Sequence, residues 1–525
     1  MTSITYEADA RPRDGAGLLL GDPPGRSGSS LAHVLLRPGG AVLALIVAGL
    51  LVRILLAAAT GLGIDESYMA ATSRTLHWSY YDHPPVAWWL AWAAEHVAGP
   101  GSDLGVRIPF ILLFALSTWL MFRLSDVLYG ARAALWTAML FNLVPVLGIT
   151  AGTWVLPDGP LVAALLGGTL CFVHALADSD RPWRWWLGAG ACFGLALCSK
   201  YTAGPILLGL GLFLLTEPSA RRWLRRPQPY VAAAAALAAL APVIFWNIGH
   251  HWASFAFQGG RAAGRHWRLA GPLTTLGGEA LFFLPWIFLP LLLLLWRAVC
   301  RGPRDARGWL LVCLSVPSFV LFELVSLRAH VLFHWAAPAL MLALPLLGEA
   351  VTTARIAPGR LRAGLIGTVC AVLAGVTLMA SEVRFNWMPE AGEDFALGKD
   401  PDMAAVNWST LRDELDRRGL LHGTTVVAGV RWLDAGKIDY ALLGRVPVIC
   451  LGPDPREYGV IRPAASYNGR DVIIVATRET LSTISGKFAR QFDSLEPLPP
   501  VTLLHAGRPA MLLPLFLGRH MHAVE

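Results

Sequence analysis

Long apolar stretches occupy most of the first 385 residues of the chain. A helix that crosses about 30 Å of hydrocarbon needs about 20 such residues, and eleven stretches approach this length. They cover residues 41–59, 106–124, 132–149, 160–177, 185–199, 203–216, 230–247, 279–297, 309–327, 331–349 and 363–381. The pattern therefore predicts a polytopic α-helical membrane protein with about 11 transmembrane helices within residues 39–384.

From about residue 385 the pattern changes to mixed charge and shorter apolar runs. The segments TTVVAGV (424–430), VPVICL (446–451) and DVIIVAT (471–477) are typical of short buried strands, and LRDELDRRGLL (411–421) is typical of an amphipathic helix. We therefore predict a soluble α/β domain over residues 385–525. Its one cysteine, Cys450, leaves it without an internal disulfide.

Composition and charge agree with a membrane protein and give its orientation. Apolar residues make up 55% of the chain and charged residues 15%, whereas an average soluble protein is about 25% charged. The net charge of +7 requires no polyanionic partner, so no nucleic acid is expected. Cytoplasmic loops collect arginine and lysine, and with the N-terminal tail inside, the inner loops hold 15 such residues and the outer loops 7. The C-terminal domain is therefore expected outside the cytoplasm.

The segments before and between the apolar stretches differ in character. Residues 1–38 are polar and are expected to form a disordered cytoplasmic tail, followed by an uncleaved signal anchor. Two outer loops, 60–105 and 248–278, are too long to be simple connections. The first carries tryptophans at helical spacing, Trp88, Trp89 and Trp92, which suit a helix in the membrane interface. Ligand chemistry is expected in these loops.

Three carboxylates lie near the outer ends of predicted helices. Asp65 and Glu66 follow the first apolar stretch, and Asp158 lies between two prolines in WVLPDGPL. Each could cap a helix, or could serve function, because a carboxylate at the membrane boundary is costly unless it is solvated or used. Both readings stay open for each residue alone, but all three fall on one side of the membrane.

Cationic and aromatic groups fall on the same side. Lys200 and Tyr201 interrupt a nearly continuous apolar stretch, and the lysine could either reach the interface or bind phosphate. Arg261 could bind an anion, as could Arg265 and Arg268. Four histidines (His83, His250, His251 and His266) have no metal-ligand spacing, and neither do the seven cysteines. No nucleotide-binding glycine motif occurs either.

Several motifs occur together in a familiar order. IDESY is followed by YYDHPPVAWWL, GVRIPFILL, LPDGPL, WWLGAGACFGLALCSKYTAG and FWNIGHHWASFAFQGGRA. This series resembles the polyprenyl-phosphate-sugar-dependent glycosyltransferases of the GT-C fold in glycosyltransferase family 39, a group that includes protein mannosyltransferases and lipid A aminoarabinose transferases. The resemblance covers about residues 40–270, and the chain lacks an evident MIR-type insert.

The resemblance implies transfer of a sugar from a lipid-phosphate carrier to a hydroxyl acceptor, usually with inversion, at the periplasmic face of the inner membrane. In this reading Asp65 is the general base, and Asp158 orients the acceptor or assists Asp65. Glu66 orders the loop or binds a cation such as Mg²⁺ or Mn²⁺, and Lys200 with Arg261 neutralises the donor phosphate. The remaining substrate contacts are expected from Tyr81, His83, Tyr201 and His251.

Two other functions remain open from the sequence. The acceptor is expected to be an envelope lipid or glycan, but a protein O-mannosyltransferase would use a polypeptide. A non-enzymatic lipid or sugar transporter would share the polytopic architecture, although no internal repeat typical of transporters is evident. In each case the partners are membrane lipids and a lipid-linked sugar, and no soluble cofactor is expected beyond a divalent cation.

Overall fold

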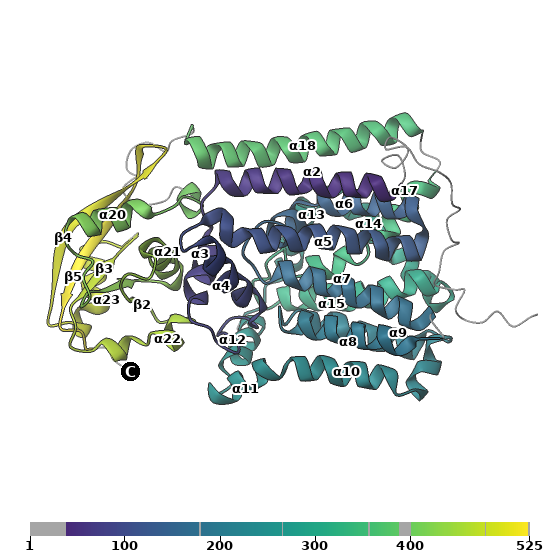
Figure 1. Ribbon diagram of the computed structural model, residues 1–525, viewed down its shortest axis with the longest axis horizontal. Coiled ribbons are helices and arrows are strands. Elements are labelled where there is room, and N and C mark those ends of the chain that lie inside the picture. Colours follow the sequence, from purple (N-terminus) through teal and green to yellow (C-terminus); the bar gives the residue numbers. More distant parts are fainter. Residues whose placement is uncertain are drawn as a thin grey trace, which may run out of the picture.

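The computed structural model describes residues 38–177, 180–264, 266–354, 357–387, 401–477 and 479–522. The predicted disordered tail lies outside the described residues except for Pro38, and so does Arg265. The chain folds into a bundle of long helices and a C-terminal α/β domain, with short helices packed between them (Figure 1).

Among the described residues, six helices are long and apolar enough to cross a membrane, and a bent pair of helices adds a seventh if it is counted as one crossing. The six are α2 (Pro38–Ala59), α5 (Asp103–Tyr129), α7 (Asp158–Ala177), α14 (Pro285–Arg301), α15 (Ala306–Ser326) and α18 (Pro358–Phe385). The bent pair is α10 (Gln228–Ala239) and α11 (Ala241–Gly249), which meet at 43°. The protein is therefore a multi-pass membrane protein.

Shorter helices complete the bundle. They are α6 (Ala131–Leu143), α8 (Pro182–Leu197), α9 (Ala203–Thr216), α13 (Gly271–Phe283), α16 (Ala337–Met341) and α17 (Leu344–Thr353). Four predicted spans are interrupted in the structure. The α-helix of the span 132–149 ends at Leu143, and the span 230–247 is the bent pair described above. The span 279–297 is divided at Leu284, whose φ is 70°, because Pro285 disfavours helical backbone in the residue before it. The span 331–349 begins in an irregular segment before α16.

Three short helices lie between the bundle and the C-terminal domain (Figure 1). The first long loop forms α3 (Ile64–Ser73) and α4 (Val86–Ala98), and the second forms α12 (Ala253–Ala262). The tryptophan helix α4 exists as predicted, but Trp88 does not face an interface. It is fully buried, and its indole nitrogen donates to the Thr72 hydroxyl at 2.9 Å.

The C-terminal domain contains a five-stranded sheet in the order β2-β1-β3-β5-β4. The three predicted strands form β1 (Val426–Gly429), β2 (Val448–Cys450) and β3 (Val472–Val475), which pair in parallel. An antiparallel hairpin of β4 (Ser494–His505) and β5 (Arg508–Arg519) extends the sheet beside β3. The domain's helices are α20 (Ser409–Arg417), α21 (Trp432–Leu442), α22 (Tyr458–Ile461) and α23 (Leu481–Phe488).

The C-terminal domain is joined to the membrane part through α3. Tyr68 and Trp88 share one hydrophobic core with Ile438 of α21. A side chain added at Gly436 would lie 2.8 Å from the Tyr68 Cα, so α21 and α3 are in backbone contact there. These contacts therefore fix the C-terminal domain against one end of the bundle.

Candidate functional site

A cavity of about 570 Å³ lies where the bundle, α3, α4 and the C-terminal domain meet. Its wall carries three carboxylates and three cations: Asp65, Asp82, Asp158, Lys200, Arg261 and Arg456. A smaller cavity of about 200 Å³ shares Lys200 and Arg261 with it and is lined elsewhere by the apolar side chains of Leu321 and Val325 on the span α15. The two shared cations therefore lie where the two cavities adjoin.

Asp65 presents an unpaired carboxylate to the larger cavity. It lies in the first turn of α3, its side chain is accessible from the cavity, and no described residue forms a hydrogen bond or ion pair with it. Protein nevertheless surrounds it. Burial raises its pKa above the usual value for aspartate, Arg456 opposes this, and Asp82 adds to it. Asp65 is thus a carboxylate whose affinity for a proton is increased and whose oxygens are free to accept one.

Glu66, the next residue on α3, has a different environment. It is 1% exposed, and each of its oxygens accepts two hydrogen bonds. Arg107 of α5 donates at 2.8 and 2.6 Å, and the backbone amides of Gly63 and Val155 donate at 2.8 and 3.0 Å. The acceptor positions of Glu66 are therefore occupied by groups of the protein, an arrangement that favours the predicted loop-ordering role over the predicted cation-binding role.

Asp158 and Lys200 form a buried ion pair. The Lys200 Nζ lies 2.8 Å from one carboxylate oxygen of Asp158 and 3.0 Å from the other. Asp158 is the first residue of α7, and Lys200 lies in the turn between α8 and α9. That turn is held against α4, because the Cys198 carbonyl accepts from the Val86 amide at 3.2 Å. Both side chains line the larger cavity with Asp65, so the carboxylates from separate stretches do meet.

His83 lies at the junction of the two cavities. Burial, reinforced by Lys200 and Arg261, lowers its pKa well below the usual value for histidine. Its imidazole is therefore neutral at physiological pH, and its buried Nδ1 has no hydrogen-bond partner among the described residues. A neutral ring with a free nitrogen can bond a ligand oxygen or hydroxyl, but it adds no positive charge.

Arg261 approaches the cavities from α12. Its guanidinium lies 4.7 Å from the centre of the Trp335 ring and 5.6 Å from that of Phe257. No ion pair holds it within the described part of the chain. An arginine positioned by aromatic rings and open to two cavities can bind a phosphate at their junction.

Arg456 is a functional candidate that the sequence analysis did not identify. It belongs to the C-terminal domain, and its Nη1 donates to Asp82 at 3.0 Å. Asp82 also accepts from the Tyr68 hydroxyl at 2.7 Å. The only available signal was the acidic and basic run DPRE at 454–457, which has no periodicity or spacing that would place it near the first loop.

Of the other predicted substrate contacts, one lines a cavity and two do not. Tyr201 lines the smaller cavity and shares a hydrogen bond of 2.8 Å with the Ser254 hydroxyl. Tyr81 lines neither cavity, and its amide donates to Glu457 at 2.7 Å. His251 is exposed in a left-handed turn (φ 53°) before α12 and also lies outside both cavities. The structure therefore does not bring Tyr81 and His251 to the cavity as predicted.

A metal centre has little support from these side chains. Within the described ranges, no group of three or more His, Cys, Asp and Glu side chains is placed to hold a metal ion. Glu66, the predicted ligand, is held by Arg107 and two amides. These residues do not fit the oxygen-rich shell that Mg²⁺ or Mn²⁺ prefers.

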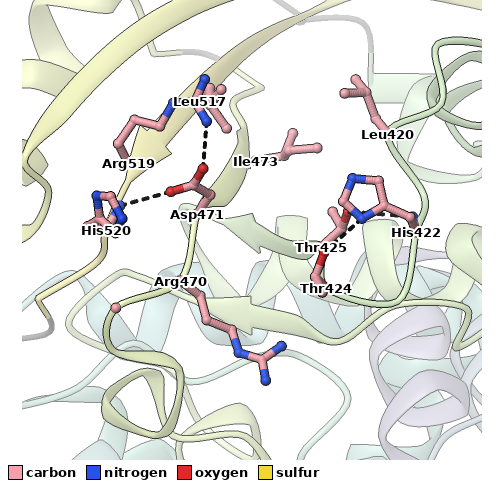
Figure 2. A pocket seen from close by; sticks show the side chains of 11 residues that line it. Leu420, His422, Thr424, Thr425, Arg470, Asp471, Ile473, Leu517, Arg519 and His520 are labelled. Carbon is pink, nitrogen blue, oxygen red and sulfur yellow. Dashed lines mark hydrogen bonds and ion pairs between the residues drawn. The ribbon is translucent and has the colours of Figure 1, made fainter.

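A third cavity, of about 510 Å³, lies at the opposite edge of the C-terminal sheet, near the starts of β1 and β3. Figure 2 shows that Asp471 accepts from Arg519 and from the backbone of His520. The Asp471 and Arg519 side chains are 40% and 44% exposed, so their interaction is weakened by solvent. This cavity holds none of the predicted site residues.

Residues 82–246 match the profile of the dolichyl-phosphate-mannose-protein mannosyltransferase family. The chain is 26% identical over 288 residues to the lipid A galacturonosyltransferase RgtD of Rhizobium johnstonii, a match that spans 54% of this chain and 59% of that relative.

Solved structures show the same fold. ArnT from Cupriavidus metallidurans in its apo state covers 91% of this chain with a TM-score of 0.62 and 16% identity, and 98% of ArnT is matched. ArnT bound to undecaprenyl phosphate gives the same coverage and TM-score with 17% identity. Residues 82–246 are therefore similar to the dolichyl-phosphate-mannose-protein mannosyltransferase family, within a chain that has the GT-C fold seen in ArnT, and the family resemblance predicted from the motifs is confirmed.

Proposed function

We propose that this protein is an integral-membrane glycosyltransferase that moves a sugar from a polyprenyl-phosphate donor to a hydroxyl group by a single inverting displacement. The observation that carries the proposal is the position of the unpaired Asp65 carboxylate, which faces the same cavity as Lys200 and Arg261. A lipid-phosphate sugar needs few other groups, because its phosphate is already a good leaving group.

The reaction can be followed atom by atom. The acceptor hydroxyl gives its proton to Asp65 as its oxygen bonds to the anomeric carbon of the sugar. The bond between that carbon and the phosphate oxygen breaks, and the polyprenyl phosphate leaves with the electron pair and an additional negative charge. Arg261 and Lys200 stabilise this charge. Because the attack occurs once and from the opposite face, the anomeric configuration inverts, and Asp65 then releases its proton to water.

The arrangement of the two cavities suits a lipid-linked donor. The smaller cavity is bounded by Leu321, Phe322 and Val325 of the span α15 and meets the larger one at Lys200 and Arg261. An isoprenoid chain would lie along the apolar side, with its phosphate at the cations and its sugar in the larger cavity. The ArnT structure bound to undecaprenyl phosphate, which has the same fold, supports a donor of this class.

The site is proposed to face the periplasm across the bacterial inner membrane. The arginine distribution along the chain supports this orientation, with the tail and inner loops in the cytoplasm. The C-terminal domain and the cavity beneath it would then both be extracytoplasmic. About 11 crossings, as the apolar pattern predicts, would bring the two ends of the chain to opposite sides of the membrane.

The proposed acceptor is an envelope glycolipid. The match to a lipid A galacturonosyltransferase supports a lipid acceptor, whereas the family description favours a polypeptide acceptor as the second candidate. Two substrate sets separate them. The purified protein is incubated with a radiolabelled polyprenyl-phosphate sugar and either lipid A in vesicles or denatured envelope protein.

We expect label in the glycolipid, with an anomeric configuration opposite to that of the donor by NMR. Label in the protein fraction would favour the second candidate. Release of free sugar without transfer to either acceptor would contradict the proposed function.

A further inference from the structure

The C-terminal domain contributes Trp432, Leu433 and Arg456 to the wall of the larger cavity, and its strand order explains how. Strands β1 and β2 are parallel neighbours, with Val427 opposite Val448. The carboxyl ends of parallel strands meet at one edge of a sheet, where ligand sites of α/β domains form. Trp432 follows β1 and Arg456 follows β2, and both line the cavity. The domain therefore contributes to the site and is not only a cover.

Arg456 is held in a fixed position at this edge. Its guanidinium lies 3.6 Å from the centre of the Trp432 ring. The Trp432 and Tyr68 rings pack edge to face, with their centres 5.1 Å apart. The Tyr68 hydroxyl also orients Asp82, the carboxylate that accepts from the Arg456 Nη1. Three groups from two domains thus define where this cation points.

Most hydrogen-bonding capacity of Arg456 remains available. A guanidinium has five N–H donors, and the hydrogen bond to Asp82 uses one. The buried Nε has no hydrogen-bond partner, although Asp454 lies 3.6 Å from it. Such a flat donor group, partly neutralised and stacked on an indole, is suited to a planar or tetrahedral anion.

Arg456 lines a different part of the site from the two cations at the junction of the cavities, although its guanidinium and that of Arg261 lie 5.2 and 5.6 Å from the centre of the same Phe257 ring. Lys200 and Arg261 line both cavities, whereas Arg456 lines only the larger one. A donor phosphate bound where the cavities join would use the first two cations. The third would then face the part of the larger cavity formed by the C-terminal domain, where a second substrate must enter.

We propose that Arg456, stacked on Trp432 and oriented by Asp82, binds an acidic group of the acceptor, a phosphate or a carboxylate, and so selects acidic glycolipids. This inference rests on the proposed function and specifies its acceptor class. Because Asp82 already balances part of the charge, a neutral acceptor would gain nothing from Arg456.

Kinetics with paired acceptors tests the proposal. The full-length protein in nanodiscs is given a polyprenyl-phosphate sugar and lipid A in two forms, either untreated or with its phosphates removed and carboxylates amidated. The variants are Arg456→Gln, Arg456→Lys and the control Arg470→Gln. Arg470 is an exposed arginine of the same domain that lines the distant third cavity.

We expect the kcat/KM of wild type to be at least about tenfold higher for the acidic acceptor than for the neutralised one, because the neutralised acceptor loses one charge-assisted hydrogen bond. Arg456→Gln should raise KM for the acidic acceptor by a similar factor and leave KM for the neutralised acceptor and for the donor unchanged. Arg456→Lys should keep part of the preference, since it keeps the charge but not the planar donors, and Arg470→Gln should behave as wild type.

Each contrary result has a distinct meaning. Equal use of the two acceptors by wild type would overturn the inference without any variant, so it does not depend on how Arg456→Gln folds. A raised donor KM in Arg456→Gln would assign the residue to the donor phosphate and also overturn it. If wild type transfers sugar to neither form of lipid A, the proposed glycolipid acceptor itself fails, and this outcome is distinct from equal use of both forms.

Discussion

Variants of the buried pair Asp158 and Lys200 are expected to affect stability and activity differently. The two side chains are 3% and 6% exposed and lie 2.8 Å apart, so removal of either charge leaves the other buried without compensation. Loss of one partner of a buried pair costs about 3–5 kcal/mol, whereas replacement of both by apolar residues is often neutral. We therefore expect Asp158→Leu and Lys200→Met each to lower the free energy of unfolding by about 3–5 kcal/mol, and the double variant to recover most of that loss.

Activity should follow a different course. If the pair is present to hold a cation at the donor phosphate, the double variant will be stable but nearly inactive. Denaturant unfolding in bicelles gives the coupling free energy, and transfer of labelled sugar gives the activity of the same preparations. Additive stability effects, with a coupling below about 0.5 kcal/mol, would refute the ion pair. A double variant with wild-type turnover would refute its role in catalysis.

Three further predictions follow from neighbouring contacts. Glu66→Gln should destabilise the protein by about 3 kcal/mol or more in the same unfolding assay, because Arg107 would stay buried without its carboxylate; stability equal to wild type would contradict the loop-ordering role. Gly436→Ala places a Cβ 2.8 Å from the Tyr68 backbone, so it should lower the free energy of unfolding by about 1–3 kcal/mol and reduce turnover by shifting α21 from α3. The control Gly423→Ala, whose Cβ would have nothing within 4 Å, should change neither stability nor turnover. Turnover should fall as pH decreases through the pKa of Asp65, which burial raises, because the base must be ionised; a rate that stays constant well below the pH of ordinary aspartate ionisation would argue against this.

The sequence predicted the residues near the membrane better than those beyond it. Asp65, Asp158 and Lys200 were predicted from motifs at the ends of apolar stretches and Arg261 from a motif in a long loop, and all four line one cavity. The three parallel strands were also predicted, since buried β-branched runs bounded by turns have a clear signature. The C-terminal hairpin was not, because β4 contains Pro497, Pro499 and Pro500 and resembles a loop.

Other features depend on partners that are distant in the chain. Glu66 and Asp65 are adjacent and chemically alike, and only the position of Arg107, 41 residues away, gives the two carboxylates different environments. The contribution of Arg456 depends on a contact with Asp82 across 374 residues. Tertiary pairing of this kind leaves no periodic trace, so a single sequence cannot predict it. Trp88 was misplaced for a related reason, because the C-terminal domain covers the helix that was expected to lie in the interface.

The most direct measurement of the central claim compares wild type with Asp65→Asn in turnover and in stability. The account predicts that turnover falls by about 10²–10⁴-fold, the usual contribution of a general base, while binding of polyprenyl phosphate is unchanged. Burial raises the pKa of Asp65 in the folded state, so its ionised form destabilises the protein near neutral pH, and the asparagine variant should unfold no earlier than wild type. A variant that is folded, binds the lipid phosphate and transfers sugar at the wild-type rate would contradict the assignment of Asp65 as the base.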